Sequence, residues 1–164
     1  RGLPRDGWPN RSEGPIIDGH EMWWWGRAML MTAAERAAAA GAIRSLLDAR
    51  AEIVFALLHG SFITEGPYRD IDLAVWVEAS AIPADRRRRY ALDLAQSLEL
   101  AIRHPMDVLV LNDAPLAVRY HALKGQPVVV RDRDFLDELR ARTWDDYFDF
   151  LPFARQYLRD ALHG

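Results

Sequence analysis

The chain has 164 residues, of which half are hydrophobic and 27% are charged, and its formal net charge is −3. This length is typical of one domain large enough to bury a core, and the slight negative charge argues against a general basic surface for nucleic acid. The absence of cysteine excludes disulfides and thiolate metal sites, and no apolar run reaches the roughly 18 residues that span a bilayer. We therefore expect a cytoplasmic protein that contacts no membrane and binds no nucleic acid directly.

The first 28 residues differ in composition from the rest of the chain. They are rich in Gly, Pro and Trp, and they show neither helical nor strand periodicity. They also lack an apolar segment of the signal-peptide type. We interpret residues 1–28 as a disordered or non-native extension, with docking of Trp23, Trp24 and Trp25 on the domain or on a partner as the alternative. Residues 29–164 are then one domain.

From Met31 onward, helical and strand patterns alternate. Thr32 and Glu35 have the spacing of a capping box, which predicts a helix from Thr32 to about Arg50. Residues 53–58 have the apolar run of a buried strand. Residues 60–68 form a polar turn, in which we expect a short helical piece beginning at Ser61.

The second half of the chain continues this alternation. The predicted elements are a strand at 71–77, a helix from Pro83 to about Ile102, a strand at 107–111, a helix at 114–123, a strand at 128–130 and one or two helices over 133–162. Pro152 should break or bend the last of these. Helices and strands in this order predict an α/β fold, in which a small sheet carries helices.

Carboxylates mark the start of the strand at 71–77. The side-chain period of a strand is two residues, so Asp70 and Asp72 project from the same face, about 6 to 7 Å apart. If the strand at 107–111 lies beside this one, Asp107 completes a cluster of three carboxylates. Such a cluster repels itself and suits one or two Mg²⁺ ions that bridge the phosphates of a nucleotide. A solvated strand end is the alternative for the pair alone.

A Gly-Ser pair closes the preceding strand. Gly60 allows the backbone to approach a ligand closely, and Ser61 can begin a short helix whose free N–H groups and hydroxyl attract a phosphate. A turn with a helix cap is the simpler alternative. Together with the carboxylates, the pair supplies what nucleotidyl transfer needs, because metals neutralise the phosphates and positioning accounts for most of the catalysis.

These residues resemble the signature of a known superfamily. Gly60-Ser61, eight residues, Asp-Ile-Asp and then Asp107 on a later strand look like the pattern of the polymerase-beta-like nucleotidyltransferases. The small size resembles their minimal nucleotidyltransferase (MNT) branch, and the likeness runs from about residue 32 to the end. It includes the segments 112–125 and 142–153. The resemblance implies an α+β fold with a small mixed sheet, flanking helices and a C-terminal helical segment.

The resemblance also implies roles for individual residues. Gly60 and Ser61 would bind the triphosphate of ATP, and Asp70, Asp72 and Asp107 would be catalytic residues that bind Mg²⁺. Asp107 would in addition assist deprotonation of the acceptor hydroxyl. The loop between Ser61 and Asp70 is shorter than is usual in the antitoxin branch, a difference that concerns the phosphate tail rather than the metal ligands.

MNT proteins of this type often act as antitoxins of HEPN-domain RNase toxins. The active ones transfer AMP from ATP to a toxin tyrosine, so the resemblance implies a HEPN partner and a homo- or hetero-oligomer. Two alternatives stay open: a non-catalytic antitoxin that neutralises the toxin by binding, and a small-molecule nucleotidyltransferase of the aminoglycoside type.

Other residues have simpler interpretations. We expect His59 to end a buried strand with its ring satisfied, and His104 to do the same at a helix–strand junction. The arginine run 86–89 is typical of a solvated helix face, with an acidic partner or RNA as the alternative. Aromatic residues gather near Pro152, which makes the terminal helix our first candidate for a partner-binding surface.

Overall fold

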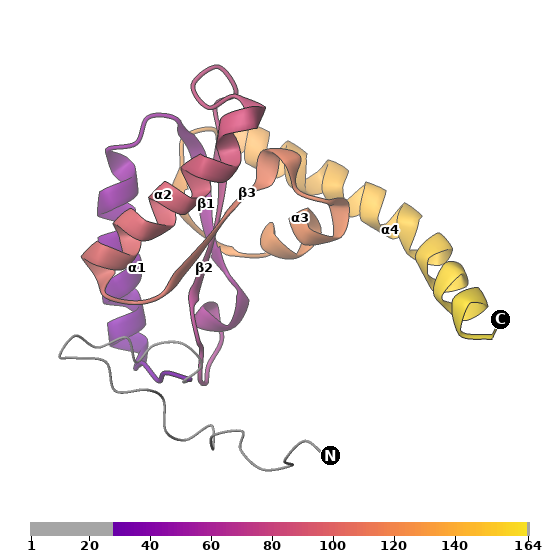
Figure 1. Ribbon diagram of the computed structural model, residues 1–164, viewed down its shortest axis with the longest axis horizontal. Helices are drawn as coiled ribbons and strands as arrows, with labels where there is room; N and C mark the ends of the chain where they lie inside the picture. The colour runs from indigo at the N-terminus through magenta and orange to yellow at the C-terminus, as the bar shows by residue number, and fades with distance from the viewer. Residues whose placement is uncertain (1–27, 164) are drawn as a thin grey trace, which may run out of the picture.

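The computed structural model describes residues 28–163 (Figure 1). The predictions for the N-terminal extension therefore lie outside the described residues, apart from Ala28. In chain order the elements are α1 (Ala33–Asp48), β1 (Ile53–His59), the 3₁₀ helix η1 (Gly60–Ile63), β2 (Ile71–Val77), α2 (Ala84–Ile102), β3 (Met106–Val110), the 3₁₀ helix η2 (Leu111–Asp113), α3 (Leu116–Ala122), β4 (Gln126–Val130) and α4 (Arg133–His163).

The four strands form one mixed sheet in the order β3-β2-β1-β4. Strand β1 pairs antiparallel with β2 and with β4, whereas β2 and β3 are parallel. A parallel pair needs a long crossover, and α2 provides it. The predicted α+β fold with a small mixed sheet is confirmed.

Helix α1 begins at the predicted capping box. The Thr32 hydroxyl accepts a hydrogen bond from the Glu35 backbone N–H at 3.2 Å, and the Glu35 carboxylate accepts one from the Thr32 N–H at 2.7 Å. These contacts satisfy N–H groups that the first turn leaves without helical partners. The helix then buries Ala39, Ile43 and Leu47.

One face of the sheet is covered by α1 and α2. Leu47 and Leu98 from the two helices belong to one buried apolar cluster with Ile53, Leu58 and Leu73 of the strands. The β1–β2 register shifts between Ile53 and Phe55, and such a bulge moves later side chains to the opposite face. This shift explains why odd-numbered Ile53 and even-numbered Leu58 share one face.

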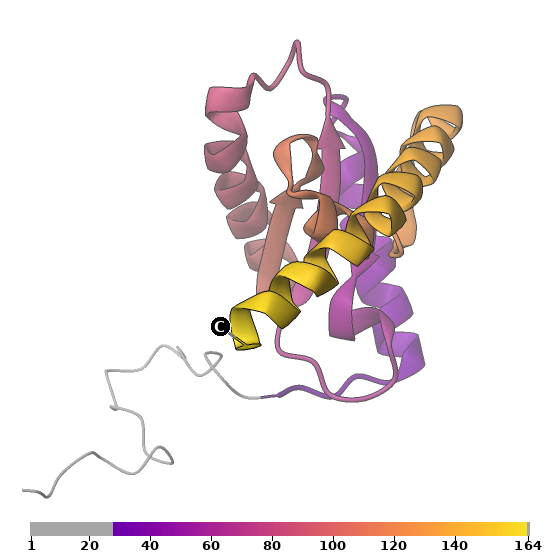
Figure 2. The ribbon, with the colours of Figure 1, turned by 90° about the vertical axis from the view of Figure 1, so that its right-hand side faces the viewer.

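The opposite face is covered by α3 and the first half of α4. In Figure 1, α1 and α2 lie on one side of the strands and α3 and α4 on the other, and in Figure 2 α4 crosses in front of the strands. The ring centres of Phe55 and Trp76, both in the sheet, lie 6.2 Å apart. The Trp76 ring meets that of Phe135 of α4 edge to face, with 5.2 Å between the ring centres. Farther along, Tyr147 of α4 stacks on Tyr120 of α3 at 3.7 Å. These contacts fix the first half of α4 on the sheet and on α3.

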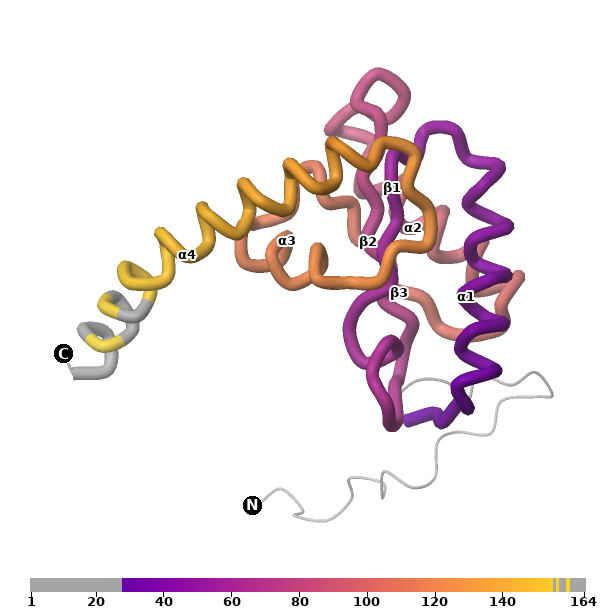
Figure 3. The backbone as a smooth tube through the Cα atoms, turned by 180° about the vertical axis from the view of Figure 1, so that it is seen from behind, coloured from indigo at the N-terminus to yellow at the C-terminus, as the bar shows by residue number. Residues whose placement is uncertain are grey.

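The second half of α4 extends away from the sheet (Figure 3). The helix runs through Pro152 without interruption, so residues 133–163 form one helix and not two, and the bend expected at Pro152 stays a prediction. Pro152 removes one helical N–H donor, but the turns on both sides continue. Three phenylalanines of this part are largely exposed, namely Phe148 (54%), Phe150 (51%) and Phe153 (73%).

Within residues 28–163, none of the helices is long and apolar enough to cross a membrane.

Candidate active site

The sheet register aligns polar residues across three neighbouring strands. Asp72 of β2 pairs with Asp107 of β3 and with His59 of β1. Ala74 and Leu109, two positions farther along β2 and β3, belong to the apolar cluster under α3 and α4. Since side chains alternate between faces, Asp72 and Asp107 lie on this same face, beyond that cluster. The expectation that the strand of Asp107 lies beside the strand of Asp72 is confirmed, while Asp70 lies just before β2.

The charge of Asp72 is disfavoured by its surroundings. Partial burial, and then the charges of Asp70 and Asp107, raise the pKa of the Asp72 carboxyl to about 6. The structure thus brings Asp70 and Asp107 close enough to Asp72 for their charges to disfavour its ionised form. A cation beside them would relieve that repulsion.

The chemistry of these donors suits a hard divalent cation. Carboxylate oxygens are the ligands that Mg²⁺ prefers, and two neighbouring strands present them on one face. In the conformation described for residues 28–163, no three His, Cys, Asp or Glu side chains converge tightly enough to form a ready-made metal group. The residues fit a metal in charge and chemistry, and their assignment as ligands stays a prediction.

Gly60 brings the backbone of η1 against Asp72. Its φ of +69° lies in the left-handed region, and a Cβ at this position would lie 2.1 Å from Oδ2 of Asp72. The positive φ favours glycine here, and a larger residue would in addition displace the Asp72 carboxylate. The 3₁₀ helix starts at Gly60, one residue earlier than predicted, and the exposed Ser61 follows in its first turn. The Gly-Ser pair and the carboxylates are therefore neighbours in space.

His59 departs from the prediction in one respect. It ends β1 as expected, but its Nε2 is buried and has no hydrogen-bond partner among the described residues, so the ring is not satisfied. Burial lowers the pKa of His59, while the nearby charge of Asp107 opposes this shift. Only the β1–β2 register shows that His59 stands beside Asp72, and the sequence alone gave no means of fixing that register.

The turn between α3 and β4 closes against the end of β1. A Cβ on Gly125 would lie 2.4 Å from the carbonyl oxygen of Leu58 and 3.1 Å from Cβ of His59. Arg140 of α4 holds the same turn, because its Nε donates to the carbonyl of Leu123 at 3.0 Å. This packing explains how the His59 ring becomes enclosed.

The arginine run on α2 is more than a solvated face. The Arg87 side chain is only 12% exposed, and its Nη1 lies 2.7 Å from the carboxylate of Asp113 in η2. Arg89, in contrast, is exposed and pairs with Asp93 one turn away on α2. The prediction that the arginine run is a solvated helix face is therefore wrong for Arg87. It agrees with the exposed position of Arg89.

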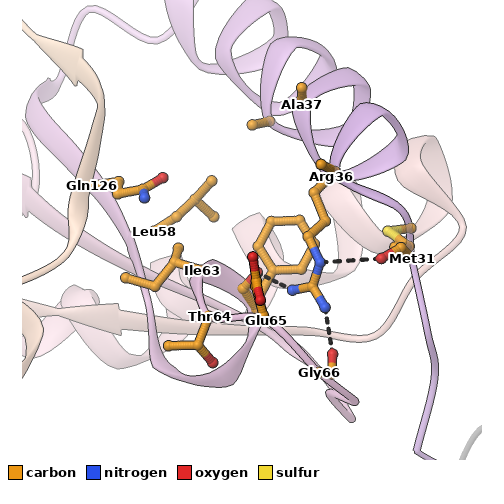
Figure 4. Close-up of a pocket in the computed structure, with 12 residues that line it drawn as sticks. Met31, Arg36, Ala37, Leu58, Ile63, Thr64, Glu65, Gly66 and Gln126 are labelled. Carbon is orange, nitrogen blue, oxygen red and sulfur yellow. Dashed lines mark hydrogen bonds between the residues drawn. The ribbon is translucent and has the colours of Figure 1, made fainter.

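On the other face of the sheet, a cavity of about 470 Å³ lies between α1, η1 and the start of β4. Leu58, Ile63 and Gln126 line it together with Arg36 of α1 (Figure 4). Sequence reasoning did not single out Arg36, because an arginine in an alanine-rich helix gives no local signal of a tertiary role.

Comparison with known proteins agrees with this architecture. The family model described as polymerase beta, nucleotidyltransferase matches residues 42–134. No curated protein matches the chain. A crystal structure of the toxin–antitoxin MntA-HepT contains a chain that is 22% identical, with 78% of this chain and 99% of that chain covered and a TM-score of 0.58.

Two further solved structures are similar at 23% identity. One is a tri-AMPylated Shewanella oneidensis HEPN toxin in complex with MNT antitoxin (79% of this chain, 99% of that chain, TM-score 0.59). The other is a toxin–antitoxin with AMP-PNP (76% and 98%, TM-score 0.59). Likeness at this level of identity establishes the shared fold. Because the family match spans more than half of its residues, the chain belongs to the polymerase beta nucleotidyltransferase family.

Proposed function

We propose that the protein is a Mg²⁺-dependent adenylyltransferase that transfers AMP from ATP to a tyrosine of a cognate HEPN RNase toxin, and thereby acts as its antitoxin in the cytoplasm. One observation carries the proposal: Gly60 holds the η1 backbone against Asp72, which pairs in register with Asp107. The backbone that would bind phosphate is thus close to Asp72, in a chain of a nucleotidyltransferase family, which supports the proposal.

The structural neighbours support the choice of donor and acceptor. One is a toxin–antitoxin with AMP-PNP, and another holds a tri-AMPylated HEPN toxin with its MNT antitoxin. Both complexes contain a chain that is 23% identical to this protein. They make a toxin side chain the acceptor to test first.

Each site residue has a role in the proposed reaction. Asp70, Asp72 and Asp107 would hold Mg²⁺, which when bound neutralises charge on the triphosphate. Gly60 and Ser61 would orient the phosphate tail through backbone N–H groups and the serine hydroxyl. The described conformation requires the carboxylate side chains to move toward the ion.

The proposed transfer of AMP is a single displacement at the α-phosphorus of ATP. The acceptor oxygen forms a bond to the α-phosphorus of ATP, while the bond from that phosphorus to the oxygen bridging to the β-phosphate breaks and pyrophosphate leaves. Asp107 would take the proton of the acceptor hydroxyl as general base. Asp107 is exposed on strand β3, at an edge of the sheet, so an acceptor from a partner can approach it.

A second candidate is a non-catalytic antitoxin that neutralises the toxin by binding alone. The exposed Phe148, Phe150 and Phe153 on α4 favour it, because exposed aromatic side chains are typical anchors of protein interfaces. A small-molecule nucleotidyltransferase has less support, since on the face that carries the carboxylates the described chain offers only α3 and α4 to shape an acceptor pocket.

A transfer assay separates these functions. The purified protein is incubated with Mg²⁺, ATP labelled at the α-phosphate and the HEPN protein encoded next to its gene. We expect label on a toxin tyrosine and none after chelation of Mg²⁺ or with the double variant Asp70→Ala, Asp72→Ala. The variant Asp93→Asn, at an exposed carboxylate on α2, serves as control. If the double variant neutralises the toxin as well as the wild type does, the catalytic proposal is wrong and the binding function is favoured.

A further inference from the structure

We propose that Arg36 of α1 is a positioning residue for nucleotide binding, because it anchors η1 and the following loop so that Gly60 and Ser61 stay against Asp72. The inference rests on the proposed function, in which Gly60 and Ser61 bind the phosphate tail of the nucleotide. Helix α1 lies on the face of the sheet away from the carboxylates. Through Arg36 it would nevertheless contribute to nucleotide binding.

The guanidinium of Arg36 donates to the backbone at several points (Figure 4). Its Nε donates to the carbonyl of Met31 at 3.4 Å. Its Nη1 donates to the carbonyls of Ser61, at 3.5 Å, and of Phe62, and its Nη2 donates to the carbonyl of Gly66. One side chain thus ties the start of α1 to both η1 and the loop that follows it.

Two buried aromatic rings support the same guanidinium. Its carbon lies 5.4 Å from the centre of the Phe62 ring and 5.1 Å from that of Tyr68, within the range of cation–π attraction. The two rings meet edge to face at 5.2 Å and are almost fully buried. These contacts with two buried rings restrict the position of the Arg36 guanidinium.

The 3₁₀ helix η1 lies between two fixed points. The carbonyls of a helix point toward its C-terminal end, and Arg36 binds two of them there, at Ser61 and Phe62. The other end of η1 begins at Gly60, in close contact with the Asp72 carboxylate. Phe62 of η1 is also buried in the apolar cluster, so loss of Arg36 should loosen this end of η1, and with it the position of Ser61 relative to Asp72, without unfolding it.

The short loop after η1 is fixed in the same way. Gly66 is bound by Arg36, and Tyr68 pairs with Met29 through backbone hydrogen bonds of 2.7 and 3.0 Å. Both anchors lie at the N-terminal side of α1. The loop between Ser61 and Asp70 is thus tied to the beginning of the domain.

Only arginine can make this set of contacts. Its planar guanidinium presents donors in fixed directions, whereas the single ammonium of lysine reaches fewer carbonyls at once. A lysine at position 36 keeps the charge but loses most of the geometry. The pair of variants Arg36→Lys and Arg36→Met therefore separates charge from geometry.

The chain contains a matched control in Arg131. Its Nε donates to the carbonyl of Ile53 at 2.9 Å and its Nη2 to that of Asp48 at 3.1 Å. It thus ties the other end of α1 to the start of β1, far from Gly60 along the strand. Arg131→Met removes comparable hydrogen bonds without touching η1.

The test measures the affinity of the full chain for AMP-PNP with Mg²⁺ by calorimetry, at a temperature where thermal melting shows each variant folded. We expect Arg36→Met to bind about tenfold more weakly, Arg36→Lys to recover part of this loss, and Arg131→Met to stay within about twofold of wild type. In the transfer assay, the KM for ATP should rise more than kcat falls.

The outcomes distinguish this inference from the proposed function. If Arg36→Met binds the nucleotide as tightly as Arg131→Met does, Arg36 is not a positioning residue. If Arg36→Met does not fold, Arg36→Lys decides by the same comparison. If the wild-type protein binds AMP-PNP but transfers no AMP, the proposed function is wrong. The affinities of the Arg36 and Arg131 variants for AMP-PNP still test the role of Arg36. A wild-type protein that binds no nucleotide overturns both.

Discussion

The two faces of the sheet differ in how completely helices cover them. On one face, α1 and α2 bury an apolar cluster that includes Ile71 at the start of β2. On the other face, the cluster under α3 and α4 includes Ala74 and Leu109 but not Asp72 and Asp107. The first face stabilises the fold, and the uncovered end of the second holds the polar residues of the candidate site.

This difference has a physical basis. Helices that bury leucine and isoleucine supply free energy in proportion to the apolar area removed from water. Carboxylates at the same place would lose their hydration, as the raised pKa of Asp72 already indicates. A site for charged phosphates therefore belongs where the covering helices stop. Substitutions of buried apolar residues on the first face and of the carboxylates on the second should accordingly affect different measurements.

The largest effect should come from Asp72→Asn on the open face. Loss of a metal-binding carboxylate should lower AMP transfer by about a thousandfold or more. The same change should raise the free energy of unfolding of the metal-free protein at neutral pH. Because the folded-state pKa of Asp72 is raised to about 6, its charge opposes folding above that pH, and the gain should disappear as the pH falls below about 4. Urea denaturation at both pH values measures this gain, and a variant that is less stable at pH 7 would contradict it.

On the closed face, Leu47→Ala should act on stability alone. Leu47 is fully buried in the cluster between α1 and the sheet, and truncation of such a leucine costs about 2–5 kcal/mol of unfolding free energy. Nucleotide affinity of the folded protein should stay within about twofold of wild type. Denaturation and calorimetry on the same sample give both values. A large loss of affinity in the folded protein would show that the apolar cluster, and not only Arg36, acts on the site.

Gly60→Ala should affect both measurements, because Gly60 is where the fold and the site meet. The added Cβ would strike the Asp72 carboxylate, and the positive φ disfavours any L side chain. We expect a loss of about 1–2 kcal/mol in stability and a more than tenfold loss in transfer. Gly41→Ala is the matched control, since a Cβ there meets nothing within 4 Å and alanine favours the helix. It should leave transfer unchanged.

The smallest effect on the isolated protein should come from Phe153→Ser. Phe153 is 73% exposed on α4, so its removal should change the unfolding free energy by less than about 0.5 kcal/mol. If the second half of α4 contacts the toxin, affinity for the toxin should fall by about tenfold. Leu100→Ser, at a residue 77% exposed on α2, is the control. Equal toxin affinity in both variants would place the interface elsewhere.

The sequence predicted the elements and much of the site because these depend on local patterns. Alternation of apolar residues identifies β2, and the capping box at Thr32 locates the start of α1. The Asp-x-Asp spacing and the position of Asp107 at the start of a strand then suffice to predict that the carboxylates meet. That prediction needed only the assumption that β2 and β3 are neighbours, which the structure confirms.

Contacts between distant segments were beyond the sequence. The unpaired ring nitrogen of His59 follows from the register of β1 and from the packing of Gly125, and neither has a local signature. The role of Arg36 depends on where η1 lies relative to α1. Pro152 left one helix or two open in the sequence, because a proline in a helix removes one hydrogen bond but does not determine whether the turns around it continue.

The parallel pairing of β2 with β3 has a consequence for the order of folding. The β1–β2 hairpin closes over a short loop, so the neighbourhood of Gly60 and Asp72 can form from local contacts. Asp107 reaches Asp72 only after the chain has traversed the whole of α2 and that helix has packed on the sheet. Closing this longer loop costs more chain entropy. We therefore expect the newly made protein to form the seat for the phosphate tail early and to complete its carboxylate cluster late.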